Sequence, residues 1–142
     1  MSRYSNGYEM LIRVFVKATT ERATELAHKL MAMFEPDVLR WDIEDYSWKF
    51  EGQHIISFFV PICETLNGDI FNKNLDEISQ KLANGGWKFC YAEQDSVGDA
   101  TWNPVPEAQF VIEEAVFAHL DVCQPKWMSD KWMKDFVPEE LD

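Results

Sequence analysis

The sequence QFVIEEAVFAHLD spans residues 109–121 and forms a long strand-like run. Apolar side chains recur at alternate positions along it, a period of two that predicts a β-strand. Glu114 interrupts the apolar face, and strands average only about five or six residues. We therefore expect a long strand that is bent or bulged at Glu113 and Glu114.

The same run lies in a longer acidic segment, residues 89–125, which has seven carboxylates and no lysine or arginine. Over the whole chain, 25 aspartates and glutamates stand against 13 lysines and arginines, which gives a net charge of −12. Because phosphate contacts need cations, this balance argues against direct binding to nucleic acid or to an anionic membrane surface. It favours attraction to a cationic partner, although solubility alone also explains it.

Length and cysteine usage predict a single cytoplasmic domain. The chain has 142 residues, of which 46% are apolar, and this is enough for one hydrophobic core. No apolar signal segment follows Met1, and no run reaches the roughly 18 apolar residues of a membrane span. Cys63, Cys90 and Cys123 are widely spaced, which fits reduced thiols better than a disulfide framework.

The chain begins with a predicted strand and helix. Residues 8–18 alternate between an apolar and a charged face, and two apolar residues on the charged face suggest that part of it is covered. Thr19 and Thr20 are candidates for the cap of the helix that follows. Its apolar stripe ends before Pro36, because proline cannot continue a helix.

Residues 39–62 predict a long hairpin with its turn at Glu51 and Gly52. The apolar residues of the first arm are odd-numbered as far as Ile43 and even-numbered from Tyr46 onward. One face of a regular strand cannot hold both sets, so we expect a bulge at 44–45.

A second helix is predicted to begin at an Asn74 cap, with Glu77 completing a capping box. Gly85 and Gly86 should close it, since glycine accepts the left-handed conformation. A further strand then begins at Trp87, and the turn-forming residues of 95–106 predict an exposed loop.

The element order β-α-β-β-α-β predicts an α+β fold of the ferredoxin-like type, in which an antiparallel sheet carries two helices on one face. One extra long strand and a short C-terminal helix follow. A related α+β sheet with a different strand order is the alternative. The single domain, 1–142, comprises a loose lead-in (1–7), the core (8–123), the C-terminal helix (126–137) and a frayed tail (138–142).

No motif for a metal, a cofactor or a nucleophile is evident, and we expect none of these. His119 and Cys123 are four residues apart, which on a strand is about 13 Å and too far for one ion to bridge locally. Cys90 lies between two aromatic residues of a predicted strand, where a buried, inert thiol is the default.

The adjacent carboxylates Glu44-Asp45 and Glu113-Glu114 both occur where the apolar alternation breaks. In the interpretation that we favour, bulges turn these side chains toward water. In the alternative, Glu114 is buried, its pKa is raised, and it acts as a general acid.

Carboxylates interleaved with tryptophans are the main functional signal. Aromatic anchors with carboxylates around them suit a tight interface with a cationic partner, although core tryptophans beside solvated acids would give the same pattern. The predicted partner-binding residues are Trp41, Asp42, Glu44, Asp45, Trp48, Glu93, Asp95, Asp99, Trp102 and Glu113.

The sequence therefore predicts an interaction protein without enzymatic activity that inhibits a basic partner such as a nuclease. Immunity, inhibitor and anti-defence proteins are of this kind, and their carboxylates stand in for phosphates. The alternative is a small-ligand-binding or regulatory domain of ferredoxin-like type, which could dimerise through its sheet. A third hypothesis is an enzyme that uses Glu114.

Overall fold

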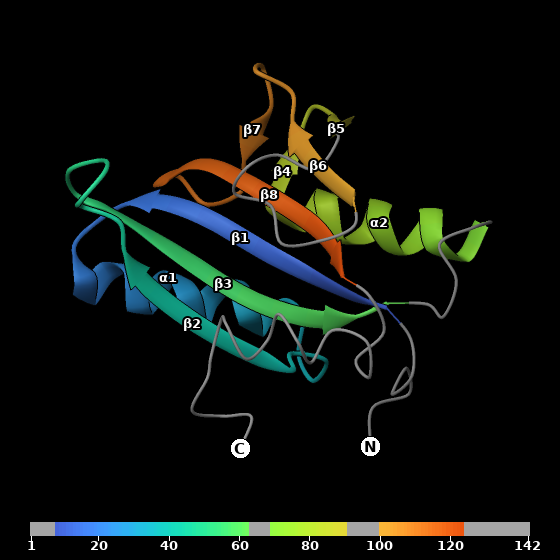
Figure 1. The fold of residues 1–142 in the computed structure, drawn as a ribbon, viewed down its shortest axis with the longest axis horizontal. Coiled ribbons are helices and arrows are strands. Elements are labelled where there is room, and N and C mark those ends of the chain that lie inside the picture. The colour runs from blue at the N-terminus through green and yellow to red at the C-terminus, as the bar shows by residue number, and fades with distance from the viewer. Residues whose placement is uncertain (1–7, 63–68, 91–99, 124–142) are drawn as a thin grey trace.

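The computed structural model describes residues 8–62, 69–90 and 100–123. Their central feature is a six-stranded sheet with the order β2-β3-β1-β8-β6-β5, in which all neighbours are antiparallel (Figure 1). Its strands are β1 (Glu9–Lys17), β2 (Arg40–Asp45), β3 (Gln53–Pro61), β5 (Trp87–Cys90), β6 (Ala100–Pro104) and β8 (Ala115–Cys123). A separate two-stranded sheet pairs β4 (Ala83–Asn84) with β7 (Gln109–Phe110).

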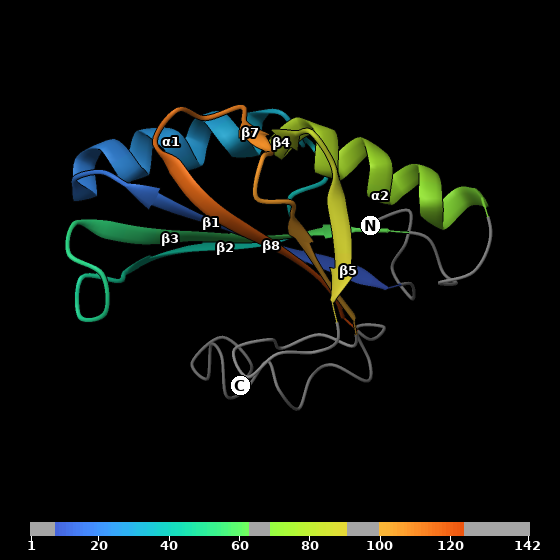
Figure 2. The ribbon, with the colours of Figure 1, turned by 90° about the horizontal axis from the view of Figure 1, so that it is seen from above.

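Two helices, α1 (Thr20–Ala32) and α2 (Asp69–Leu82), lie on one face of the six-stranded sheet (Figure 2). Alternate residues of the central strands point toward them and form the core. The strand residues of that core are Met10, Ile12, Val14, Val16, Ile56, Phe58, Val60, Ala118, Leu120 and Val122. The predicted α+β class, with an antiparallel sheet and two helices, is therefore confirmed. We call the opposite side of the sheet, which carries neither α1 nor α2, its helix-free face.

The start and end of α1 follow the sequence prediction. The Thr19 side chain accepts a hydrogen bond from the Arg22 amide at 3.2 Å, so Thr19 is the N-cap. The helix ends at Ala32, before Pro36.

The predicted start of the second helix is wrong, because α2 begins at Asp69. Asn74 lies inside the helix, where its side-chain amide donates to the Ile70 carbonyl at 2.8 Å. Phe71 is buried in the core, and this packing holds the first turn of α2. The helix does end ahead of Gly85, which has φ +117° and meets the Ala108 backbone so closely that a side chain there would need the chain to shift.

Neither predicted long strand is continuous. The first arm of the hairpin ends at Asp45, and residues 46–52 form the turn. The switch of apolar residues from odd to even positions therefore marks the end of β2. The predicted bulge at 44–45 is wrong, because the register of β2 with β3 is continuous. The run 109–121 divides into β7 and β8, with the break at residues 111–114. A register shift between Phe15 and Val16 then leaves Val116 as the extra residue of a bulge in β8.

The ferredoxin-like topology is not confirmed, because the element order differs from the prediction. The prediction makes the strand that begins at Trp87 the last strand of the β-α-β-β-α-β unit. In the structure, the strand beside β1 is β8. The strand that begins at Trp87, β5, is instead the last strand of the sheet, beyond β6. The predicted lead-in (1–7), C-terminal helix (126–137) and tail (138–142) lie outside the described residues.

Candidate functional site

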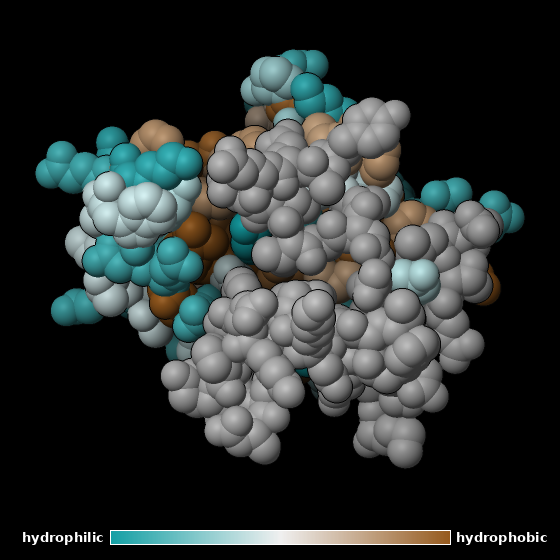
Figure 3. All heavy atoms as spheres, in the orientation of Figure 1, coloured by the Kyte–Doolittle hydropathy of each residue, from teal (hydrophilic) through white to brown (hydrophobic). Residues whose placement is uncertain are grey.

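The exposed residues of β2 and of the turn after it form an acidic and aromatic surface, which we call the β2 surface. Trp48 is 74% exposed, and Trp41 and Phe50 are each 49% exposed. Figure 3 shows hydrophilic residues gathered at the end of the molecule that carries the turn between β2 and β3. We define the β2 surface by its acidic and aromatic residues Trp41, Asp42, Glu44, Asp45, Trp48 and Phe50, all exposed; the same turn also exposes Lys49 and Glu51.

The alternation along β2 separates its carboxylates from its apolar residues. The Trp41 ring lies edge-on to His28 of α1, with the ring centroids 5.6 Å apart, so Trp41 is on the helix side of the sheet. Ile43 follows it on that side, while Asp42 and Glu44 project from the helix-free face. Two carboxylates therefore stand side by side at the outer strand of the sheet.

A buried tyrosine holds the turn in place. Tyr46 is only 8% exposed, and its ring lies edge-on to Phe15 of β1 at 5.5 Å and to Trp48 at 5.3 Å. The Phe50 ring packs at a tilt against the Tyr46 ring, with the two centroids 5.7 Å apart. Trp48 and Phe50 thus contact Tyr46, while Trp48 remains largely exposed and Phe50 about half exposed, as expected of preorganised contact residues.

Asp45 is held in its charged form. Hydrogen bonds from the hydroxyl and the amide of Ser47 lower the pKa of the Asp45 carboxyl below its ordinary value. The amide of Ser47 donates at 2.9 Å.

The cations near the β2 surface do not neutralise it. Arg40, the only basic residue of β2, donates to the Glu9 carboxylate at 2.5 Å and stacks over the Phe59 ring at 4.3 Å. The Lys49 ammonium lies over the Tyr46 ring at 5.9 Å. Among the described residues, no carboxylate of the β2 surface forms an ion pair.

The structure brings only some of the other predicted binding residues toward this surface. Glu113 is exposed in the turn before β8, at the end of the sheet that also carries Gly52. Trp102 instead packs into the core, with its ring 5.8 Å from Phe71 and 5.2 Å from Phe89. Glu93, Asp95 and Asp99 lie outside the described residues.

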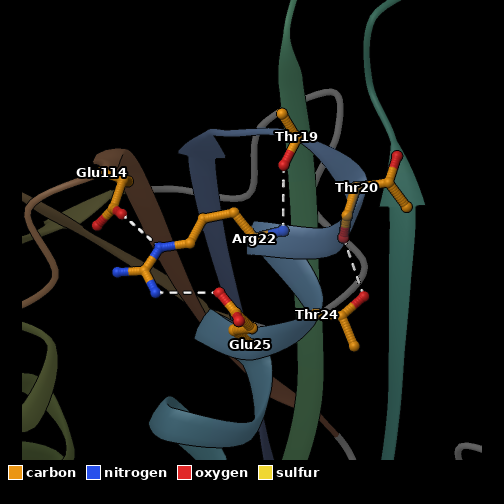
Figure 4. A network of polar contacts seen from close by, with 6 residues as sticks. All are labelled: Thr19, Thr20, Arg22, Thr24, Glu25 and Glu114. Atoms are coloured by element: carbon orange, nitrogen blue, oxygen red, sulfur yellow. Dashed lines mark hydrogen bonds and ion pairs between the residues drawn. The ribbon is translucent and has the colours of Figure 1, made fainter.

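Glu114 joins the start of β8 to α1 (Figure 4). Its carboxylate accepts a hydrogen bond from Arg22 Nε at 2.7 Å, and Arg22 also pairs with Glu25 at 3.2 Å. The hydrogen bond from Arg22 is the largest cause of a lowered pKa for Glu114. The alternative prediction of a buried Glu114 with a raised pKa is therefore wrong.

A buried polar network on the helix-free face was not predicted. Asp121 is fully buried, and its two oxygens accept from Arg13 Nη2 at 3.0 Å and from the Thr101 hydroxyl at 2.5 Å. Glu9 is 4% exposed and pairs with Arg40. One sequence signal did point toward this network: charged and apolar residues share one face of β1. From that pattern we predicted only that part of the face is covered.

A second polar group contains the buried His119 and Asn103 together with Cys90, which is half-buried rather than buried as predicted. The side chain of Asn103 lies between the other two, with Oδ1 2.5 Å from His119 Nδ1 and Nδ2 donating to Cys90 Sγ at 3.3 Å. Because the amide separates the imidazole from the thiol, this arrangement does not place a base on a nucleophile.

Clefts of about 340, 360 and 390 Å³ in the described part of the chain are open to solvent. The 390 Å³ cleft lies between the end of α2, Gly85, Trp87 and Trp102. Over the same residues, no group of three or more histidines, cysteines or carboxylates is arranged to hold a metal. Neither helix is long and apolar enough to cross a bilayer.

Comparisons of this chain with protein-family models, with curated proteins and with solved structures found no match.

Proposed function

We propose that this protein is an interaction module that binds a basic protein through the β2 surface and thereby inhibits it. The observation that carries the proposal is that β2 and the turn after it combine preorganised aromatic residues with exposed carboxylates that form no ion pair among the described residues. Trp48 and Phe50 contact Tyr46 and are still exposed, and Asp42 and Glu44 are exposed on β2, the strand that leads into this turn. Aromatic anchors supply most of the affinity at interfaces, and charge complementarity supplies specificity and rapid association.

A nuclease or another nucleic-acid enzyme is the class of partner that fits best. Such enzymes bind phosphates at cationic sites, and the carboxylates of the β2 surface would occupy the phosphate positions. The net charge of −12 would accelerate the encounter with a cationic partner at low salt. Immunity, inhibitor and anti-defence proteins act in this way.

The proposal is tested by capture from a lysate of the native host, followed by elution with increasing salt. The test variant carries Asp42→Asn and Glu44→Gln. The control carries Asp76→Asn and Glu77→Gln, two exposed carboxylates of α2, so that both variants lose the same charge. We expect wild type and the control to retain a basic nucleic-acid enzyme to a higher salt concentration than the test variant does, and the activity of that enzyme to fall when wild-type protein is added.

Equal retention by both variants would show that only the overall charge matters. Failure of wild type to retain any basic protein at low salt would overturn the proposed function.

A second candidate function is small-ligand binding by a ferredoxin-like core made of β1, α1, β2, β3, α2 and β8, with β5 and β6 as an insertion. The 390 Å³ cleft beside Trp87 and Trp102 favours it, since ligand sites are commonly of this size and lined by aromatic residues. The cleft is open to solvent, whereas such sites bury most of their ligand. A screen of small molecules by tryptophan fluorescence tests this candidate. A fluorescence change that comes from a ligand in the cleft should be reduced in the Trp87→Phe variant, because Trp87 lines the cleft.

A further inference from the structure

The outer edge of β2 has backbone groups that do not face β3. In an antiparallel pair, residues alternate between positions that exchange hydrogen bonds with the neighbour and positions whose backbone groups point away from it. The Tyr46 amide donates to the Gln53 carbonyl at 2.9 Å, which makes these two residues a hydrogen-bonded pair. The continuous register then directs the N–H and C=O groups of Trp41, Ile43 and Asp45 away from β3.

These outward groups have no backbone partner among the described residues, and β2 is the terminal strand of the sheet. An open edge of this kind is a template for another strand. We propose that the basic partner binds by adding one of its own β-strands to the open edge of β2. This inference rests on the proposed function and specifies the segment that the partner contributes.

The side chains of β2 define the chemistry of the added strand. Asp42 and Glu44 project from the helix-free face, so the partner strand carries lysine or arginine at alternate positions on that face. Trp41 and Ile43 lie on the helix side, so the intervening positions are β-branched or aromatic. Since β2 has six residues, the partner segment has a similar length.

The same carboxylates disfavour a second copy of this chain. If β2 paired with β2 of another molecule, Asp42 and Glu44 would lie opposite like charges, which destabilises a strand pair. The carboxylates therefore favour a cationic strand in two ways: they attract it, and they repel a second copy of this chain.

The opposite edge of the sheet provides an internal contrast. Val105 N donates to the Gly86 carbonyl at 3.1 Å, so the same argument directs the backbone of Trp87 and Phe89 outward from β5. That strand has only four residues, and its one charged side chain is Lys88. A short edge strand with a lysine is a common protection against strand addition, and it repels a cationic segment.

The test uses synthetic peptides of about eight residues in which lysine alternates with valine or threonine. Binding is measured by calorimetry, and hydrogen exchange of the Trp41 and Ile43 amides is followed by NMR. Two analogues carry backbone N-methyl groups, one on all lysines and the other on all intervening residues, so that each blocks one edge of the strand and keeps every charge.

We expect the lysine peptide to bind and to slow exchange of both amides. One N-methylated analogue should bind at least about tenfold more weakly than the other, because it loses several hydrogen bonds to β2. The variant with Asp42→Lys and Glu44→Lys keeps the backbone edge, and it should instead bind the matching peptide in which glutamate replaces lysine.

Equal binding of both analogues without protection of Trp41 and Ile43 would overturn strand addition. Failure of the lysine peptides to bind would overturn it as well. The lysate experiment separates the two proposals: if wild type retains a basic enzyme there, the proposed function stands although strand addition has failed. If it retains none, both fail.

Discussion

Carboxylates occupy two contrasting regions of this protein. On the central strands, Asp121 and Glu9 are almost fully buried, and each is paired with an arginine. At the outer strand, Asp42 and Glu44 are exposed and form no ion pair among the described residues. The same functional group therefore has two physical roles. Buried carboxylates are constrained by the fold, whereas those at the edge are available to a partner.

The largest expected effect concerns the buried region. Asp121→Asn leaves the guanidinium of Arg13 in a nearly buried site without its counter-charge. Breaking a buried pair in this way costs about 3–5 kcal/mol, so urea unfolding should show a loss of that size. A loss below about 1 kcal/mol would mean that water reaches the pair and that the contrast between the two regions is much weaker.

The double variant with Arg13→Met and Asp121→Asn is the matched control for that measurement. It removes both charges, so it should be less destabilised than the sum of the two single variants.

The next effect concerns binding rather than stability. Trp48→Ala removes a side chain that is 74% exposed, so the free energy of unfolding should change little. If Trp48 anchors the partner, the affinity should fall by about 2 kcal/mol, or roughly 30-fold. Phe89→Ala, an exposed aromatic residue at the opposite edge, should leave the affinity unchanged. Equal losses from both variants would show that the two edges do not differ.

A smaller effect is expected from the exposed carboxylates. Asp42→Asn with Glu44→Gln should slow association with the captured partner several-fold at low salt and leave dissociation largely unaffected, if these charges act mainly by steering. The stability of the fold should remain within about 0.5 kcal/mol of wild type. A large loss of stability would instead show that Asp42 and Glu44, like Asp121, are needed for the fold.

The contrast between these regions also explains which features the sequence could predict. Local patterns predicted a helix cap at Thr19 or Thr20, a helix end before Pro36 and the α+β class, since each depends on a few neighbouring residues. The break at Glu113 and Glu114 was expected, but its form was not. Whether an interrupted strand bulges or divides between two sheets depends on β4, which pairs with β7 from a distant part of the chain.

The candidate site shows the same limit. The acidic and aromatic pattern predicted residues of the β2 surface, and it also included Trp102, which tertiary packing places against Phe71. The pairing of Arg13 with Asp121 joins residues 108 positions apart, and no local pattern encodes it. Alternation shows which residues share a face of a strand, whereas the neighbour of that strand is decided by the whole fold.

Glu114 stands between the two kinds of carboxylate and gives the smallest predicted effect. Its side chain is 27% exposed, and the hydrogen bond from Arg22 lowers its pKa in the folded protein. A lowered pKa means that the stabilisation is present at neutral pH and is lost as the pH falls through the folded-state pKa. Glu114→Gln should therefore lower Tm slightly at neutral pH, and the difference from wild type should shrink below about pH 4. Glu25→Gln, at the more exposed end of the Arg22 network, should have a smaller effect still.

If Glu114 had the raised pKa of a general acid, the sign would reverse and Glu114→Gln would raise Tm at neutral pH. Thermal unfolding of the three proteins across this pH range therefore decides whether Glu114 belongs with the structural carboxylates.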